Sequence, residues 1–224
     1  MKASAHAAMD GHRHVRAVAF DLDGTLLDTT GLIVDSFVHV CETHGLQGLS
    51  RDHWERGIGL PLRDAFAPHA RDALHLDELV ACYRAYNLAH HDARVSAYDG
   101  VPELIASLRQ RGLGMSVVSN KLRATVHRGL VVTGMVDAFT LVIGLDDMTK
   151  PKPDPEAIFR VAEVHGVAPH ELAVVGDSPF DMKAARAAGA LAIGVVWGPG
   201  QRDVLHEAGA HRLADTPADV LACL

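Results

Sequence analysis

The sequence predicts an α/β fold: a Rossmann-like three-layer core with a parallel sheet, plus an inserted all-α cap subdomain. Short apolar segments alternate with helical segments along residues 97–224, and this alternation is typical of a parallel sheet covered by helices on both faces. Another apolar segment, residues 15–20, has the character of a buried strand. It is separated from the alternating region by residues 31–96, which show helical patterns and no convincing strand. We interpret this helical block as an insertion.

The chain is therefore expected to contain three parts. A flexible N-terminal tail covers residues 1–13, the Rossmann-like core covers residues 14–30 and 97–224, and the helical cap subdomain covers residues 31–96. At 224 residues the chain is long enough to bury a sizeable core and to hold one large domain with an insert.

The expected elements follow from apolar spacing and from helix start and stop signals. Ile33 and Phe37 begin the apolar stripe of an amphipathic cap helix that Gly45 ends, and a second long cap helix runs to about Asp92. Pro102 lies just inside the start of the next helix. The expected core strands are residues 15–20, 115–118, 141–143, 172–175 and 191–196, and the expected core helices are residues 101–111, 122–132, 155–164, 179–188 and a segment near Val204.

The composition limits the class of partner. A formal net charge of −7 argues against nucleic acid or an anionic membrane as the main partner. Cys41, Cys82 and Cys223 lie far apart without a C-x-x-C pair, which indicates buried thiols in a reducing compartment. No apolar run approaches the roughly 20 residues of a membrane span. We expect a cytoplasmic protein, and the sequence carries no signal for its oligomeric state.

An acidic turn follows the first expected strand. In Asp21-Leu22-Asp23-Gly24-Thr25, two carboxylates stand two residues apart where a turn can bring both to one point. Two carboxylates at one point repel each other unless a cation or a shared proton relieves them. The turn is therefore compatible with a metal site, an acid/base pair, or a nucleophile with its helper.

Polar motifs follow three more of the expected strands, and the carboxyl ends of parallel strands meet at one edge of a sheet, where ligands bind. Acids, a hydroxyl group and lysines gathered there suit phosphoryl transfer. Mg²⁺ binds through one or two carboxylates plus substrate phosphate, and an aspartate can attack phosphorus to form an aspartyl-phosphate. The motifs after the four strands are Asp21–Thr25, Ser119–Asn120, Lys150–Pro155 and Gly176–Asp181.

With these motifs in this order, the chain resembles a hydrolase of the haloacid dehalogenase superfamily with a helical (C1-type) cap, of the phosphoglycolate-phosphatase-like group. The motifs that carry the resemblance are D-x-D-G-T from Asp21, the hydroxyl of Ser119, K-P-x-P-D-P from Lys150 and G-D-S-x-x-D from Gly176. The expected cap matches the cap of that group, so the resemblance covers nearly all of the chain.

The resemblance implies a division of roles around a Mg²⁺ ion. Asp21 is the nucleophile and a metal ligand. Asp23 is the general acid/base and ligates the metal through its backbone carbonyl, and Asp177 completes the metal site. Thr25 is expected to fasten the turn rather than to touch the substrate.

The remaining motif residues are expected to bind and neutralise the phosphoryl group. Ser119 and Asn120 would bind it, and Lys150 would neutralise it while restraining Asp21. Lys150 is preferred over Lys152 because the family's lysine precedes the first proline of the motif. Asp181 is expected to support the metal shell or the lysine.

The resemblance implies a phosphoric monoester hydrolase: a Mg²⁺-dependent phosphatase that acts on a small phosphorylated metabolite through an aspartyl-phosphate, with 2-phosphoglycolate as one candidate. A pyrophosphatase and a sugar phosphomutase of the same family are the alternatives. Relatives that cleave carbon–phosphorus bonds need a cap lysine, and residues 31–98 contain none; dehalogenating relatives lack the second acid, Asp23. A phosphorylatable receiver-like signalling domain is disfavoured because receivers are about half this length.

One cap loop is expected to reach the substrate. Gly57-Ile58-Gly59-Leu60-Pro61, with Arg63 behind it, resembles the cap loop that contacts the active site in this group. Arg63 is the cap residue that we expect to bind a carboxylate or a second phosphate of the substrate.

Overall fold

The central sheet and its helices are described for residues 14–224 in a computed structural model; the tail predicted for residues 1–13 lies outside the described residues. The sheet strands are β1 (Ala17–Phe20), β4 (Gly114–Val118), β5 (Leu141–Ile143), β6 (Leu172–Gly176), β7 (Leu191–Val195) and β8 (Arg212–Ala214). The helices of the core are α5 (Val101–Gln110), α6 (Arg123–Val132), α7 (Glu156–His165), α8 (Pro179–Ala188), α9 (Arg202–Glu207) and α10 (Pro217–Cys223). Short 3₁₀ turns also occur at η2 (Val136–Ala138), η3 (Leu145–Asp147) and η4 (Pro169–Glu171).

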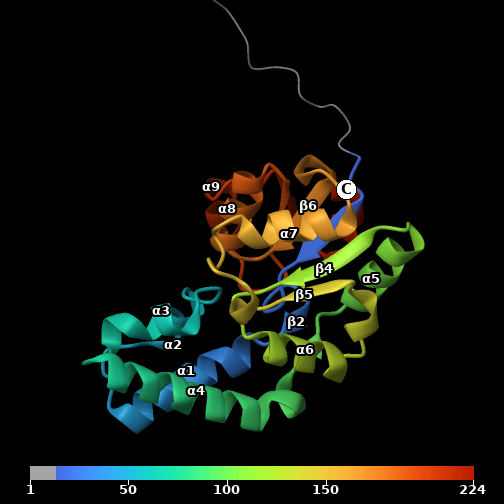
Figure 1. Cartoon of the computed structure of the whole chain (residues 1–224). Coiled ribbons are helices and arrows are strands. Elements are labelled where there is room, and N and C mark those ends of the chain that lie inside the picture. Colours follow the sequence, from blue (N-terminus) through green and yellow to red (C-terminus); the bar gives the residue numbers. More distant parts are fainter. Residues whose placement is uncertain (1–13) are drawn as a thin grey trace, which may run out of the picture.

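All neighbouring strands of this six-stranded sheet are parallel, in the order β5-β4-β1-β6-β7-β8 (Figure 1). The strand that carries the acidic turn, β1, therefore lies between β4 and β6. The α/β fold class with a Rossmann-like parallel sheet is confirmed.

The side chains of β1 alternate between the two faces of the sheet, as the two-residue period of a strand requires. Val18 and Phe20 pack in the apolar layer that contains α5, α6 and α10. Ala17 and Ala19 pack in the opposite layer, against side chains of α7, α8 and α9. Both faces of the sheet are thus covered, which gives the three layers of the core.

The helices inserted after β1 have an apolar core of their own. They are α1 (Thr30–His44), α2 (Arg51–Glu55), α3 (Leu62–Phe66), η1 (Ala67–His69) and α4 (Ala73–Arg94), and they form an arm beside the sheet (Figure 1). Phe37 stacks on Trp54 with ring centroids 4.3 Å apart and also contacts Phe66 and Tyr83. Buried aromatic groups bury large apolar areas and contribute strongly to the stability of such a small unit.

A short antiparallel strand pair joins the arm to the core. It consists of β2 (Leu27–Asp28) and β3 (Ser96–Ala97), in which Leu27 pairs with Ala97. Strands of two residues are too short to show the alternation that predicts a strand, so the sequence does not reveal this pair. The chain enters and leaves the arm next to residues 31 and 96, and we retain these positions as proposed boundaries of the cap.

Among residues 14–224, no helix combines the length and the apolar character that a membrane span needs.

Candidate active site

The predicted site residues of the core meet at the carboxyl edge of the sheet. Asp21 directly follows β1, Ser119 directly follows β4, and Asp177 directly follows β6. Backbone pairing extends past the ends of the strands: the Asp21 N–H donates to the Val175 carbonyl at 2.9 Å, and the Ser119 N–H donates to the Ile143 carbonyl at 3.0 Å. The backbone hydrogen bonds of the sheet therefore hold these residues side by side, independently of the contacts of their side chains.

A buried ion-pair network forms the centre of the site. The ammonium of Lys152 lies 2.7 Å from Oδ1 of Asp21 and 2.6 Å from Oδ1 of Asp181, and it donates to the carbonyl of Val118 at 2.8 Å. The Lys152 side chain is only 3% exposed. Asp181 also accepts a 2.5 Å hydrogen bond from Oγ of Ser178. Charge-assisted contacts of this kind are strong and directional, so they fix the position of the Asp21 carboxylate.

The prediction that Lys150 restrains Asp21 needs correction. The side chain of Lys150 is 70% exposed, and its ammonium lies 3.7 Å from a carboxylate oxygen of Asp154, away from the site. Lys152 occupies the expected place. The K-P-K-P repeat offers two lysines that each precede a proline, and spacing alone does not show which one the loop turns inward.

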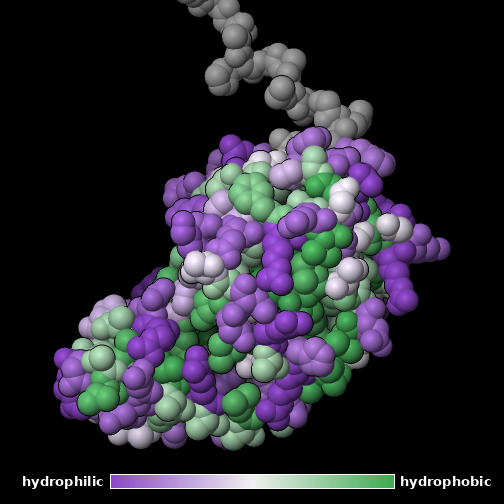
Figure 2. Space-filling view, viewed as in Figure 1, coloured by the Kyte–Doolittle hydropathy of each residue, from purple (hydrophilic) through white to green (hydrophobic). Residues whose placement is uncertain are grey.

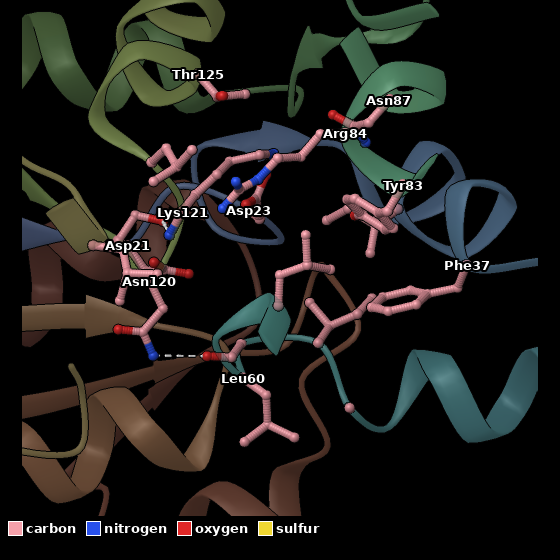
Figure 3. Close-up of a pocket in the computed structure, with 18 of the residues that line it drawn as sticks. Asp21, Asp23, Phe37, Leu60, Tyr83, Arg84, Asn87, Asn120, Lys121 and Thr125 are labelled. Carbon is pink, nitrogen blue, oxygen red and sulfur yellow. Dashed lines mark hydrogen bonds and ion pairs between the residues drawn. The ribbon is translucent and has the colours of Figure 1, made fainter. Parts of the chain in front are cut away.

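The side-chain amide of Asn120 holds the backbone of Lys152 in place. Its Oδ1 accepts from the Lys152 N–H at 3.0 Å, and its Nδ2 donates to the Lys152 carbonyl at 3.1 Å. Nδ2 also donates to the carbonyl of Gly59, in the predicted cap loop, at 2.9 Å (Figure 3). Both amide protons are thus committed, so the side chain of Asn120 has no free donor for a phosphate. Ser119 Oγ accepts from the Lys121 N–H at 3.2 Å and lines the same cavity.

Three carboxylates gather around Lys152 and could hold a metal ion. Asp21, Asp177 and Asp181 are buried, and they offer ligand atoms that all lie within 4.8 Å of one another. Both carboxylate oxygens of Asp181 are engaged, Oδ1 by Lys152 and Oδ2 by Ser178, which leaves Asp21 and Asp177 as the better ligands. Two carboxylates with space for water and phosphate are what Mg²⁺ prefers, so the donor set fits this ion.

The turn after β1 is shaped to let Asp177 approach. Gly24 has φ +79°, and a Cβ at this position would lie 2.4 Å from a carboxylate oxygen of Asp177. Only glycine therefore fits between the turn and Asp177. Oγ1 of Thr25 donates to Oδ1 of Asp177 at 3.2 Å, so Thr25 fastens this carboxylate to the turn.

The electrostatics of the cluster favour a cation. Burial, followed by repulsion from Asp181 and Asp23, raises the pKa of Asp21 to about 7, although Lys152 opposes the shift. Burial and the nearby Asp21 and Asp181 raise the pKa of Asp177 well above its ordinary value. Burial alone would lower the pKa of Lys152, but attraction to Asp181 and Asp21 outweighs it and raises that pKa. Lys152 therefore stays charged, but its single positive charge does not balance the negative charge of the three carboxylates.

The second acid of the turn has different partners. Oδ1 of Asp23 accepts from the ammonium of Lys121 and from Oγ1 of Thr29, both at 2.7 Å. Asp23 and Lys121 are each 15% exposed and line the cavity. Lys121 was not among the predicted site residues, although its position directly after Ser119 and Asn120 places it on the same edge of the sheet.

A cavity of about 130 Å³ lies between these residues and the cap. The core contributes Asp21, Asp23 and Lys121 to its lining, and the cap contributes side chains from α1, α4 and the loop at residues 57–60. In Figure 3, Arg84 extends from α4 toward Lys121 and Asp23, while Phe37 lies on the opposite side of the cavity.

The prediction that Arg63 reaches the substrate is not supported by its position. Arg63 lies on α3 with a side chain that is 51% exposed, it pairs with Asp77, and it is not among the residues that line the cavity. The cap cation at the cavity is Arg84, on α4. An arginine on a helix gives no signal for the direction in which its side chain points, so the sequence could not distinguish the two.

A second group of possible metal ligands, His44, His75 and Glu78, lies in the cap. Nδ1 of His75 accepts a hydrogen bond from the Arg71 N–H at 3.1 Å, so a neutral ring carries its proton on Nε2. A protonated Nε2 does not ligate a metal, and we assign this group no metal.

Comparison with known proteins agrees with this geometry. A family model described as haloacid dehalogenase-like hydrolase matches residues 18–195. A protein named pyrophosphatase PpaX from Anoxybacillus flavithermus is 38% identical over 184 residues, which are 82% of this chain and 85% of the relative. The pyrophosphatase PpaX of Bacillus velezensis is also 38% identical, over 83% of this chain and 85% of its own.

Solved structures share the whole architecture. A haloacid dehalogenase-like family hydrolase from Streptococcus pneumoniae is 24% identical, with a TM-score of 0.82 over 94% of this chain and 98% of its own. A predicted phosphoglycolate phosphatase from Haemophilus somnus is 22% identical, with a TM-score of 0.84 over 95% of this chain and 99% of its own. At these identities the likeness establishes the fold, with the helical arm included.

We expect Lys152→Met to lower the free energy of unfolding by about 3–5 kcal/mol, because it leaves two buried carboxylates without their cation. Urea unfolding at pH 8 measures the loss. The control is Lys150→Met, which removes an exposed ammonium and should stay within about 0.5 kcal/mol of the unsubstituted protein. Equal losses in the two variants would contradict the placement of Lys152.

We expect Mg²⁺ to bind more tightly at pH 8 than at pH 5, by at least about tenfold, because bound protons must leave the carboxylates first. The pKa of Asp21 is about 7, so its contribution to the stability of the metal-free protein falls as the pH rises through 7. Bound Mg²⁺ should restore the stability that is lost as the pH rises. Calorimetric titration with MgCl₂ at the two pH values measures the effect, with Asp177→Asn as control; equal or tighter binding at pH 5 would refute it.

Proposed function

We propose that this chain, which belongs to the haloacid dehalogenase-like hydrolase family, is a Mg²⁺-dependent phosphatase that hydrolyses a small phosphorylated metabolite through an aspartyl-phosphate intermediate. The observation that carries the proposal is the buried Asp21, which is held by Lys152, lies close to Asp177 and lines a cavity between the core and the cap.

Asp21 is suited to act as the nucleophile. Lys152 holds its Oδ1, which leaves Oδ2 as the oxygen that attacks phosphorus. The attack forms an Oδ2–P bond and breaks the bond between phosphorus and the leaving-group oxygen. Water then attacks the phosphorus of the aspartyl-phosphate, which releases phosphate and restores the carboxylate.

Asp21 and Asp177 would hold the Mg²⁺ ion. The resemblance to the family adds the backbone carbonyl of Asp23 as a third ligand. When bound, the ion supplies positive charge to the transferring phosphoryl group. Ser119 Oγ is the side-chain group that would donate to a remaining phosphoryl oxygen, whereas the three N–H donors of Lys152 are already engaged and this residue would contribute only its charge. The side chain of Asn120 instead positions Lys152, and only its backbone N–H would be available to the phosphate.

Asp23 is suited to move the protons. It lines the cavity next to Asp21, where it would donate a proton to the leaving alkoxide and later accept one from the attacking water. Lys121 and Thr29 both donate to Oδ1 of Asp23, so Oδ2 is the oxygen that would carry the proton.

Pyrophosphate hydrolysis is the second candidate. The observation that favours it is the name pyrophosphatase PpaX carried by relatives that are 38% identical to this chain. The same nucleophile and metal would serve, since phosphate replaces the alkoxide as leaving group. A phosphomutase would differ by returning the phosphoryl group to an organic product. Assays of phosphate release in MgCl₂ from 2-phosphoglycolate, pyrophosphate and hexose phosphates separate the three.

We expect Asp21→Asn to lower kcat by about 10⁴-fold or more on every substrate that is turned over, because it removes the attacking carboxylate. Phosphate release in MgCl₂ measures the loss. Trapping of ³²P from labelled substrate in acid-quenched unsubstituted enzyme, and its absence in the variant, tests the intermediate directly. Turnover of the variant within tenfold of normal would exclude the mechanism.

Asp23→Asn should lower kcat by about 10²–10⁴-fold on alkyl phosphates, which need protonation of the leaving oxygen. The loss should be smaller on 4-nitrophenyl phosphate, whose leaving group departs as a stable anion. The ratio of the two losses, measured in single-turnover experiments, reports the role of Asp23 as acid. An equal loss on both esters would argue that Asp23 acts only on the structure of the site.

A further inference from the structure

We infer that Arg84 determines specificity by binding a second anionic group on the substrate, and that the leaving group joining this anion to the phosphate is organic and partly apolar. The inference rests on the proposed function, because it concerns the cavity in which phosphate transfer would occur. It assigns a substrate class, phosphate esters of small hydroxy acids or of similar anionic alcohols, and excludes inorganic pyrophosphate as the preferred substrate.

Arg84 is a half-buried cation that faces the cavity without a partner in the described part of the chain. It lies on α4, and Figure 3 shows its side chain reaching toward Lys121 and Asp23. Within residues 14–224, its guanidinium makes no hydrogen bond or ion pair. Among the other cap arginines, Arg51 and Arg94 both contact Asp35. Arg56 and Arg71 have no such partner among the described residues, but they are exposed and do not line this cavity. A planar guanidinium with its donors unused is suited to bind a carboxylate or phosphate through two hydrogen bonds.

The charges around the cavity leave Arg84 available. Lys152 is neutralised by Asp21 and Asp181, and Lys121 is paired with Asp23 at 2.7 Å. The transferring phosphoryl group would lie at Ser119 and the metal site. Arg84 is therefore the cation of the lining that has no carboxylate of its own, and a second anion of the substrate would supply one.

The cap wall of the cavity is mostly apolar. Its apolar side chains are Ile33, Phe37, Ile58, Leu60, Leu62 and Leu88, and Tyr83 and Asn87 are its polar, uncharged ones. Apolar, green residues also reach the surface where the arm meets the core in Figure 2. Pyrophosphate presents only charged oxygens, and pressing them against such a wall would cost free energy without a compensating hydrogen bond. Carbon atoms between the phosphate and the second anion would instead contact the wall favourably.

The test separates the two features with matched substrates in MgCl₂. Methyl phosphate and phenyl phosphate lack a second anion, and 2-phosphoglycolate and 4-carboxyphenyl phosphate add a carboxylate to the same frameworks. Inorganic pyrophosphate is the fifth substrate. Each is assayed with the unsubstituted enzyme, Arg84→Gln, Arg84→Lys and Arg71→Gln. Arg71 is the matched control, because it is an exposed arginine of the same cap that does not line the cavity.

We expect Arg84→Gln to raise KM by at least tenfold on the two carboxylate esters, with kcat changed less than threefold. Its kcat/KM on methyl and phenyl phosphate should stay within twofold, which also shows that the variant is folded. Arg84→Lys should recover part of the lost affinity, since it restores the charge without the planar pair of donors. Arg71→Gln should behave as the unsubstituted enzyme on all five.

Equal losses on all substrates in Arg84→Gln, or no loss on any, would overturn the role of Arg84. A higher kcat/KM on pyrophosphate than on either carboxylate ester would overturn the organic leaving group. Failure of the proposed function is a separate result: none of the five substrates would then show turnover that Asp21→Asn abolishes.

Discussion

The ion pair between Lys152 and Asp21 is the interaction on which the rest of the site depends. Lys152 comes from the loop after β5, Asp21 follows β1, and the second partner of the ammonium, Asp181, begins α8. One buried ammonium thus joins three segments that are far apart in the sequence. Because a buried charge without its partner is costly, each segment must hold its position for the other two to be stable.

The same network leaves the site with an excess of negative charge. Three buried carboxylates, Asp21, Asp177 and Asp181, share a single buried ammonium. Their mutual repulsion and burial raise the pKa values of Asp21 and Asp177, so the metal-free protein holds protons that a divalent cation would displace. The fold therefore keeps Asp21 beside a group of carboxylates that attracts a cation.

The sequence predicted the core of this arrangement because sheet topology determines it. Asp21, Ser119 and Asp177 directly follow strands, and parallel strands end at one edge. The choice between Lys150 and Lys152 was beyond prediction, because it depends on the contact of one loop with the amide of Asn120. The cap was harder still. Arg63 and Arg84 are both helical arginines, and only tertiary packing directs one of them to the cavity and the other to solvent.

The amide of Asn120 has a mechanical consequence. It holds Lys152 with two hydrogen bonds and the cap with one, through the carbonyl of Gly59. Movement of the cap away from the core would break only the hydrogen bond to Gly59. Water can replace this bond, so its loss costs a net ~0.5–1.5 kcal/mol, one to three times the thermal energy. This hydrogen bond therefore adds little to the stability of the contact between cap and core. The hydrogen bonds of Asn120 to Lys152 do not depend on it, so the lysine keeps its place whether or not the bond to the cap loop is made.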